Sequence, residues 1–463
     1  QSTRGTFGSG GIFNPFVDER DDGLATVAWL KEQSWFPGSF VTNGASYLGH
    51  VQWAIAQNAG PELKAMAIQV STSEFRSQTY PGEAFSLDTA LSWTYMVAHQ
   101  ETTSFFKQLL SPATRKLSAI FRQLPLQDLD KQATGEHQFF YQDWLKHNEP
   151  GDEFWSVRGF EETVKDISLP INMIGGWYDI FLPWQLRDYR TLRESGQRPY
   201  LTIGPWAHSS FGLIGLATRE SLSWLKAVLQ GEHEQYRELP VRIFVTGANE
   251  WRDLADWPPP GTQSQHFYLQ PGGALDAALP PTSEPDTYRY DPANPTPVLA
   301  GPVLAGKALP TDNRSLEARA DVLLYTSAPL DKDLEIIGPL QANLFVKSSL
   351  EHADFFVRLC DVDLKGKSIN VCDGLLRIRP GRPAASSDGT LHITFDLWPT
   401  AHRFRAGHCL RVQISSGAHP RFARNPGSGE PLGSATKLLI ADQSIYHDPE
   451  HPSSVLVSLS EPL

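Results

Sequence analysis

The sequence has few of the residues that would indicate a disulfide framework, a membrane span or a nucleic-acid partner. Its three cysteines, Cys360, Cys372 and Cys409, are too few and too odd in number for a disulfide framework, so we expect reduced thiols and a cytoplasmic location. No apolar run is long enough to cross a bilayer, and we expect no membrane partner. Runs of Lys or Arg are absent and the formal net charge is −12, which argues against nucleic acid as a partner.

Metal and cofactor motifs are equally scarce. His447 and His451 lack the Cys or carboxylate neighbours that a zinc site requires. The glycines near the N-terminus have neither the spacing nor the following Lys of a phosphate-binding loop. We therefore expect no metal and no cofactor, and a small uncharged substrate suits this acidic chain better than a polyanion.

The length and the repeating patterns indicate two or three globular domains. Alternating helix and strand patterns of the length that forms a parallel sheet with crossover helices are followed by short strands between Gly and Pro turns. The predicted units are an α/β core at 1–76 and 161–258, an inserted helical cap at 77–160, and a β-sandwich or jelly roll at 259–463. Helical patterns in the cap cover 86–99 and 103–126.

The segment 40–49 carries the first chemical signal. A β-branched and aromatic run ends in Asn43-Gly44, Ser46 follows between small residues, and helical periodicity begins at once. Strand, sharp turn and helix in this order form a nucleophile elbow, in which the serine Oγ projects from the sheet edge. Because Gly49 lies three residues after the serine rather than two, the motif is weakly specific by itself. His50, one helical turn after Ser46, is expected to be a packing or surface residue.

An acid and a base follow two later predicted strands. Asp179 comes after a strand at 167–174 and a Gly-Gly-Trp-Tyr turn, and His208 comes after a strand at 200–203. The carboxyl ends of parallel strands share one edge of the sheet, where ligands bind, so we expect both side chains near Ser46.

The chain order Ser, Asp, His is the order found in α/β-hydrolases. In this interpretation His208 takes the proton of Ser46, Asp179 orients His208, and the backbone N–H of Tyr47 binds the oxyanion. Taken singly, Asp179 could instead be a helix N-cap and His208 a buried structural histidine.

Several longer motifs resemble the cocaine esterase and X-Pro dipeptidyl-peptidase family of serine hydrolases over nearly the whole chain. They are Gln1–Gly5, Gly44–Gly49, Gly176–Asp179, Gly204–His208, Glu250–Arg252, Gly407–Val412 and Pro420–Pro426. The resemblance implies an α/β-hydrolase core, an inserted helical cap and a C-terminal jelly roll. It also implies that Ser46, Asp179 and His208 form the catalytic triad.

Two departures from the family pattern matter. Members of the family carry a long segment before Arg-Gly-x-Phe, with early sheet strands and a tyrosine whose hydroxyl is the second oxyanion donor. This sequence opens on Gln1 without it, so we expect that donor to lie in an upstream segment. Relatives that hydrolyse α-amino acid esters carry carboxylates just after the triad aspartate, whereas Ile180-Phe181-Leu182 stands here. We therefore expect an apolar acyl pocket with Phe181 and Trp177 in its wall.

The sequence thus predicts a serine hydrolase that cleaves carboxylic esters of small acyl substrates through an acyl-enzyme. Two alternatives stay open: an acylase or X-Pro dipeptidyl-peptidase that acts on amide bonds, and an inert hydrolase-fold protein whose jelly roll binds a ligand. The expected partner is a small-molecule ester or amide, and a homodimer is the expected form if the chain self-associates.

Overall fold

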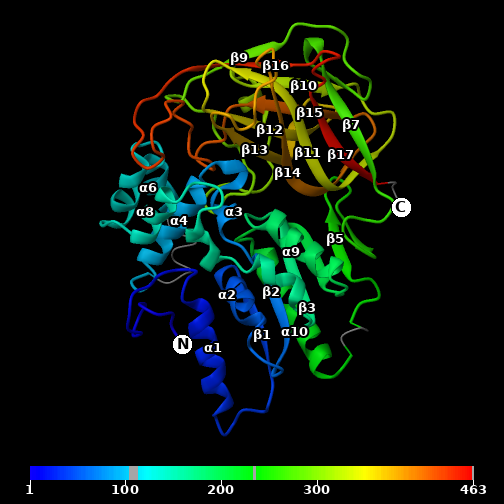
Figure 1. Cartoon of the computed structure of the whole chain (residues 1–463). Helices are drawn as coiled ribbons and strands as arrows, with labels where there is room; N and C mark the ends of the chain where they lie inside the picture. The colour runs from blue at the N-terminus through cyan, green and yellow to red at the C-terminus, as the bar shows by residue number, and fades with distance from the viewer. Residues whose placement is uncertain (104–112, 233–235, 461–463) are drawn as a thin grey trace.

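The computed structural model describes residues 1–103, 113–232 and 236–460. Figure 1 shows an α/β core, a group of helices at one side of it, and a large β domain stacked on both. The core sheet has six strands in sequence order, of which the first five are parallel and the sixth is antiparallel to the fifth. These strands are β1 (Phe40–Ala45), β2 (Leu63–Gln69), β3 (Ile171–Tyr178), β4 (Tyr200–Ala207), β5 (Val241–Val245) and β6 (Glu250–Leu254).

Helices connect the strands as crossovers and cover the sheet. They are α1 (Glu19–Lys31), α2 (Tyr47–Ala56), α9 (Leu182–Glu194) and α10 (Phe211–Leu229). All eight residues of β3 are buried, as expected for a parallel strand covered on both faces. This strand begins four residues later than the predicted 167–174 strand and includes Gly175 to Tyr178, which the sequence had suggested to be a turn.

Between β2 and β3 the chain forms the helical cap. Its helices are α3 (Arg76–Thr79), α4 (Leu87–Ala98), α6 (Ala113–Ile120), α7 (Leu129–Thr134) and α8 (Phe139–Lys146). An aromatic cluster that includes Phe85, Tyr141 and Trp144 fills its centre. The predicted 103–126 helix lies partly outside the described residues, because 104–112 are not described. The helix also ends earlier than predicted, because α6 stops at Ile120. Pro125, inside the predicted range, has no N–H for a helical hydrogen bond.

The C-terminal domain is the β jelly roll of the predicted α/β-hydrolase architecture. Its strands are β7 (Gln263–Gln270), β8 (Ala274–Asp276), β9 (Asp286–Tyr290), β10 (Leu323–Ser327), β11 (Leu334–Ser348), β12 (Ala353–Val362), β13 (Ser368–Ile378), β14 (Leu391–Phe404), β15 (Cys409–Ser415), β16 (Ala441–Tyr446) and β17 (Ser454–Ser460). The cysteines are free thiols, with Cys360 and Cys372 buried in this domain. Among the described residues, no helix combines the length and the apolar character needed to cross a membrane.

One hydrophobic cluster joins the core to the jelly roll. Trp184 of α9 packs edge-on against Trp398 of β14, with ring centroids 5.7 Å apart. The indole N–H of Trp398 donates to the backbone carbonyl of Asp179 at 3.2 Å. The jelly roll therefore supports the loop that follows β3.

Candidate active site

Ser46 sits at the turn between β1 and α2 in a backbone conformation that is rare for a side-chain-bearing residue. Its φ is 58° and its ψ is −124°, and its N–H donates to the carbonyl of Gln69 at 2.9 Å. Such strain costs of the order of 1–3 kcal/mol and persists where the surroundings impose it. Gly49 lets α2 approach the segment that follows β2, because an added Cβ there would lie 2.8 Å from Ser71 Oγ. The local sequence thus builds the elbow that the 40–49 pattern predicted.

The three side chains predicted to meet lie in contact at the carboxyl edge of the sheet. His208 Nε2 is 2.9 Å from Ser46 Oγ, and His208 Nδ1 is 2.7 Å from Asp179 Oδ2. The other oxygen of Asp179 accepts the N–H of Phe181 at 2.8 Å, which fixes the turn before α9. Asp179 is fully buried, whereas the His208 side chain is 10% exposed. In this geometry a carboxylate holds Nδ1 protonated, which leaves Nε2 free to take the serine proton.

Tyr47 presents its backbone and its side chain in different ways. As the first residue of α2, it has a backbone N–H with no carbonyl one turn earlier in the helix to accept it. Its hydroxyl donates to the buried carboxylate of Glu19 in α1, and its ring stacks on Trp93 of α4. Burial raises the pKa of Tyr47 well above its usual range and also raises the pKa of Glu19. Sequence reasoning missed Glu19, which looked like one more acidic residue in the first turn of a helix.

A cavity of about 850 Å³ opens beside these groups. Its wall includes Ser46, Tyr47, Phe181 and His208 together with residues of the cap and of the jelly roll. The Phe181 ring lies 5.4 Å from the His208 ring, centroid to centroid. Most of the remaining wall is apolar, formed by side chains such as Phe16, Phe75, Trp93, Met96, Leu117, Trp144, Leu213 and Ile214.

Trp177 lies elsewhere, and its predicted place in the pocket wall is wrong. Its indole N–H donates to the carbonyl of Phe244 at 2.7 Å, and its ring packs 5.3 Å from that of Trp257. Only 3% of its surface is exposed. The reason is register: Trp177 is part of β3, where strand alternation places it on the same face as Met173, inside the core.

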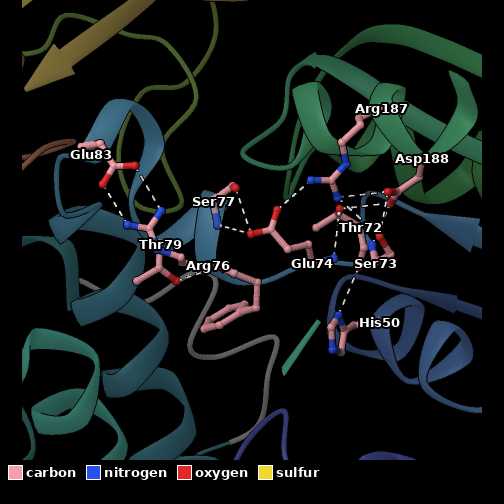
Figure 2. Close-up of polar contacts among 11 residues, drawn as sticks. His50, Thr72, Ser73, Glu74, Arg76, Ser77, Thr79, Glu83, Arg187 and Asp188 are labelled. Carbon is pink, nitrogen blue, oxygen red and sulfur yellow. Dashed lines mark hydrogen bonds and ion pairs between the residues drawn. The ribbon is translucent and has the colours of Figure 1, made fainter. Parts of the chain in front are cut away.

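Glu74 is the one acidic residue among the described residues that line the cavity, and it is already paired. Its Oε1 accepts the backbone N–H and the hydroxyl of Ser77 at 2.7 and 2.9 Å, and its Oε2 accepts Arg187 Nη1 at 2.8 Å. Figure 2 shows Arg187 reaching from α9 between Glu74 and the buried Asp188. Asp188 also accepts three hydrogen bonds from Thr72 and Ser73. The wall therefore offers no unpaired carboxylate among the described residues.

His50 is buried rather than exposed, which agrees with the packing role considered for it. Its Nδ1 donates to the carbonyl of Thr72 at 3.1 Å (Figure 2). Burial lowers the pKa of His50 to about 4, so the ring is neutral near pH 7. This contact ties α2 to the segment that follows β2.

A second serine, histidine and aspartate lie in contact within the jelly roll. Ser283 Oγ is 2.8 Å from His447 Nδ1, and His447 Nε2 is 3.0 Å from Asp286 Oδ2. The ring is reversed relative to His208, and Ser283 Oγ also donates to the His447 carbonyl at 2.9 Å. This set joins the segment before β9 to the residue after β16, and it provides a control for the Ser46 site. Within 1–103, 113–232 and 236–460, no group of three or more His, Cys, Asp and Glu residues could hold a metal ion.

A serine on a strained elbow, backed by histidine and aspartate beneath a helical cap, defines the α/β-hydrolase class. Comparison with family models matches residues 1–210 to the X-Pro dipeptidyl-peptidase (S15) family and residues 235–456 to the X-Pro dipeptidyl-peptidase C-terminal non-catalytic domain. The cocaine esterase of Rhodococcus sp. (strain MB1 Bresler) is 32% identical over 504 aligned positions, which cover 99% of this chain and 87% of that protein. The chain therefore belongs to this family of serine-type hydrolases.

Solved structures show the same fold. An α-amino acid ester hydrolase superposes with a TM-score of 0.82 at 23% identity, covering 99% of this chain and 84% of that one. An aminopeptidase from a marine sediment archaeon, Thaumarchaeota archaeon, superposes with a TM-score of 0.80 at 22% identity, covering 98% and 84%. At these identities the likeness concerns the fold and not the substrate.

Proposed function

We propose that the chain is a serine esterase that cleaves carboxylic esters of small, uncharged acyl groups through an acyl-enzyme. The observation that carries the proposal is the hydrogen-bonded order Ser46, His208, Asp179 at the wall of an apolar cavity. Ser46 attacks the ester carbonyl while His208 takes its proton. Asp179 keeps His208 in the required tautomer and stabilises the imidazolium that forms.

The same groups complete the formation of the acyl-enzyme and then hydrolyse it. His208 donates its proton to the departing alkoxide, which leaves Ser46 acylated. A water molecule then attacks the acyl-enzyme with His208 as base, and the acid departs as Ser46 regains its proton. The N–H of Tyr47 is a donor for the oxyanion in both steps.

The lining supports a neutral acyl group. A substrate with a free α-amino group needs a carboxylate to pair with its ammonium, and Glu74 is already paired with Arg187 and Ser77. Ester cleavage is also the activity named for the Rhodococcus relative. Dipeptide release from a free N-terminus, which the X-Pro dipeptidyl-peptidase name would suggest, has less support from this wall.

A fluorophosphonate probe tests the nucleophile. We expect the probe to label wild type and Ser283→Ala, in which the second contact set loses its serine, but not Ser46→Ala. Equal labelling of folded Ser46→Ala, or none of folded wild type, would contradict the proposal and favour an inert binding protein.

A matched pair of substrates tests the acyl preference. Phenyl propionate and the phenyl ester of alanine differ by one ammonium group, and we expect a higher kcat/KM for the propionate. A preference for the alanine ester, or faster cleavage of matched anilides than of esters, would instead support an aminopeptidase-type activity.

A further inference from the structure

A loop of the β domain forms part of the active-site wall. Leu304, Ala305 and Gly306 line the same cavity as Ser46. The N–H of Gly301 donates to the carbonyl of Ala308 at 3.0 Å, which closes the segment into a loop. The position of this loop therefore contributes to the shape of the cavity.

The base of the loop, Leu299 and Ala300, is held by Arg358 of the β domain. Arg358 of β12 is fully buried and donates to the carbonyls of Leu299 at 2.7 Å and Ala300 at 3.0 Å. Ala300 has a φ of 59°, a left-handed conformation that only a firm attachment maintains in a residue with a Cβ. These bonds hold the base but do not reach the residues that line the cavity.

A carboxylate of the cap accepts hydrogen bonds from the cavity-lining part of the loop. Asp88 Oδ1 accepts the backbone N–H of Leu304 at 2.7 Å and that of Ala305 at 3.1 Å. Asp88 lies in the first turn of α4 and is 2% exposed. Neighbouring α4 residues, among them Thr89 and Trp93, line the cavity as well. One side chain thus connects the helical wall of the cavity to its loop wall.

A carboxylic acid is energetically unfavourable at this buried position. Burial raises the pKa of Asp88 to about 7, although the two amide donors and the charge of Arg421 act in the opposite direction. A buried carboxylate with a raised pKa costs folding stability near neutral pH, and an amide of the same shape could accept the same hydrogen bonds. Fold stability alone does not account for the acid.

We propose that Asp88 is a positioning residue that holds Leu304 and Ala305 in the cavity wall and thereby limits the size of the acyl group that the site accepts. This inference rests on the proposed esterase function. Asp88 does not touch the reacting atoms, and its effect passes through the loop.

The hold on the loop depends on pH in a defined direction. Opening the loop would return Asp88 to water and its pKa towards the ordinary value, so the closed loop binds the proton more strongly. Closure is therefore weakened as the pH rises from about 4 to about 7 and changes little above that range. Arg421, which pairs with Asp373, is the charged group that faces Asp88 from the β domain.

Amide hydrogen exchange of residues 299–308 tests the hold without reference to activity. After correction for intrinsic rates, we expect faster exchange in wild type at pH 8.5 than at pH 6. Asp88→Ala should exchange about tenfold faster than wild type at pH 6, because two buried amides lose their acceptor. Asp88→Asn should stay slow at both pH values, since its amide oxygen still accepts and carries no charge.

Asp130 provides the control variant. It is a buried aspartate of the cap that accepts the backbone N–H groups of Lys131 and Gln138, each at 2.7 Å, and it does not bond the loop. Asp130→Ala should leave exchange at 299–308 unchanged. Unchanged exchange in Asp88→Ala, or equal acceleration in Asp130→Ala, would overturn the inference.

Kinetics test the consequence for substrate size. The ratio of kcat/KM for phenyl octanoate to that for phenyl acetate cancels the shared contribution of His208. We expect Asp88→Ala to raise this ratio about tenfold, mainly through KM, and Asp88→Asn and Asp130→Asn to leave it within about twofold. A ratio that is unchanged or lower in Asp88→Ala contradicts the size limit. If wild type cleaves neither ester, the proposed function fails, whereas the exchange experiment still decides the role of Asp88.

Discussion

Replacement of Asp179 by Asn changes the tautomer of His208 with little change in shape. In the native site one carboxylate oxygen accepts the N–H of Phe181 and the other accepts Nδ1–H of His208. In Asp179→Asn, the amide oxygen can remain on the Phe181 N–H. The NH₂ group then faces Nδ1 of His208, and Nδ1 must be unprotonated to accept its hydrogen bond. The ring proton moves to Nε2 and points at Ser46, so His208 no longer accepts the serine proton. If the amide flips, its NH₂ group faces the Phe181 N–H instead, and two hydrogen-bond donors oppose each other there.

The expected loss is large and confined to the chemical step. A triad aspartate-to-asparagine change costs about 10,000-fold in kcat, equivalent to about 5.5 kcal/mol of activation free energy. Substrate contacts in the cavity do not involve Asp179, so KM should stay within a few-fold of wild type. The assay is steady-state hydrolysis of phenyl acetate by Asp179→Asn, together with a thermal melt to show that the variant is folded.

Asp286→Asn is the matched control, because Asp286 also hydrogen-bonds a histidine, at Nε2 of His447 rather than at Nδ1 as Asp179 does in His208. It should retain wild-type kcat. If folded Asp179→Asn kept kcat within tenfold of wild type, or if Asp286→Asn lost as much activity, the assignment of Asp179 as the residue that orients the base would be refuted.

Two further predictions concern the elbow and its helix. Gly49→Ala should lower the free energy of unfolding by about 1–3 kcal/mol in urea titrations, because the new methyl group overlaps Ser71, whereas Gly215→Ala in α10 meets no atom within 4 Å and should not. The pKa of His50, lowered to about 4, means that the unfolded chain binds the proton more strongly between pH 6.5 and 4. Wild type should therefore lose about 3 kcal/mol of stability as the pH falls through that window, and His50→Gln should lose correspondingly less. Equal pH slopes for the two proteins would contradict the burial argument.

The elements that carry the candidate site could be predicted because their signals are local. A β-branched run, a glycine turn and immediate helical periodicity define the elbow around Ser46 within ten residues. Asp179 and His208 follow strands of the same sheet, and parallel strands bring their carboxyl ends to one edge regardless of what lies between them. The three side chains do lie together, and their chemical roles remain predictions.

Trp177 shows where local signals stop being sufficient. The pattern of residues 167–178 indicates a strand but not its first residue, and a shift of a few positions decides whether a tryptophan ends in a turn near the site or within β3. In the structure, β3 continues to Tyr178 and buries Trp177 against Trp257. Strand register is fixed by packing against the neighbouring strands and not by the strand's own sequence.

The amino-acid sequence by itself determined the class of fold, the elbow and the order of the three polar residues, because each depends on short-range preferences for strand, turn and helix. Only the tertiary structure decided that Glu19 lies under Tyr47, that Glu74 pairs with Arg187, and that Asp88 holds a loop more than two hundred residues away, at Leu304. Contacts of this kind join segments with no local pattern in common. They form because burial leaves polar groups in need of partners, and which partner is within reach depends on how the domains pack.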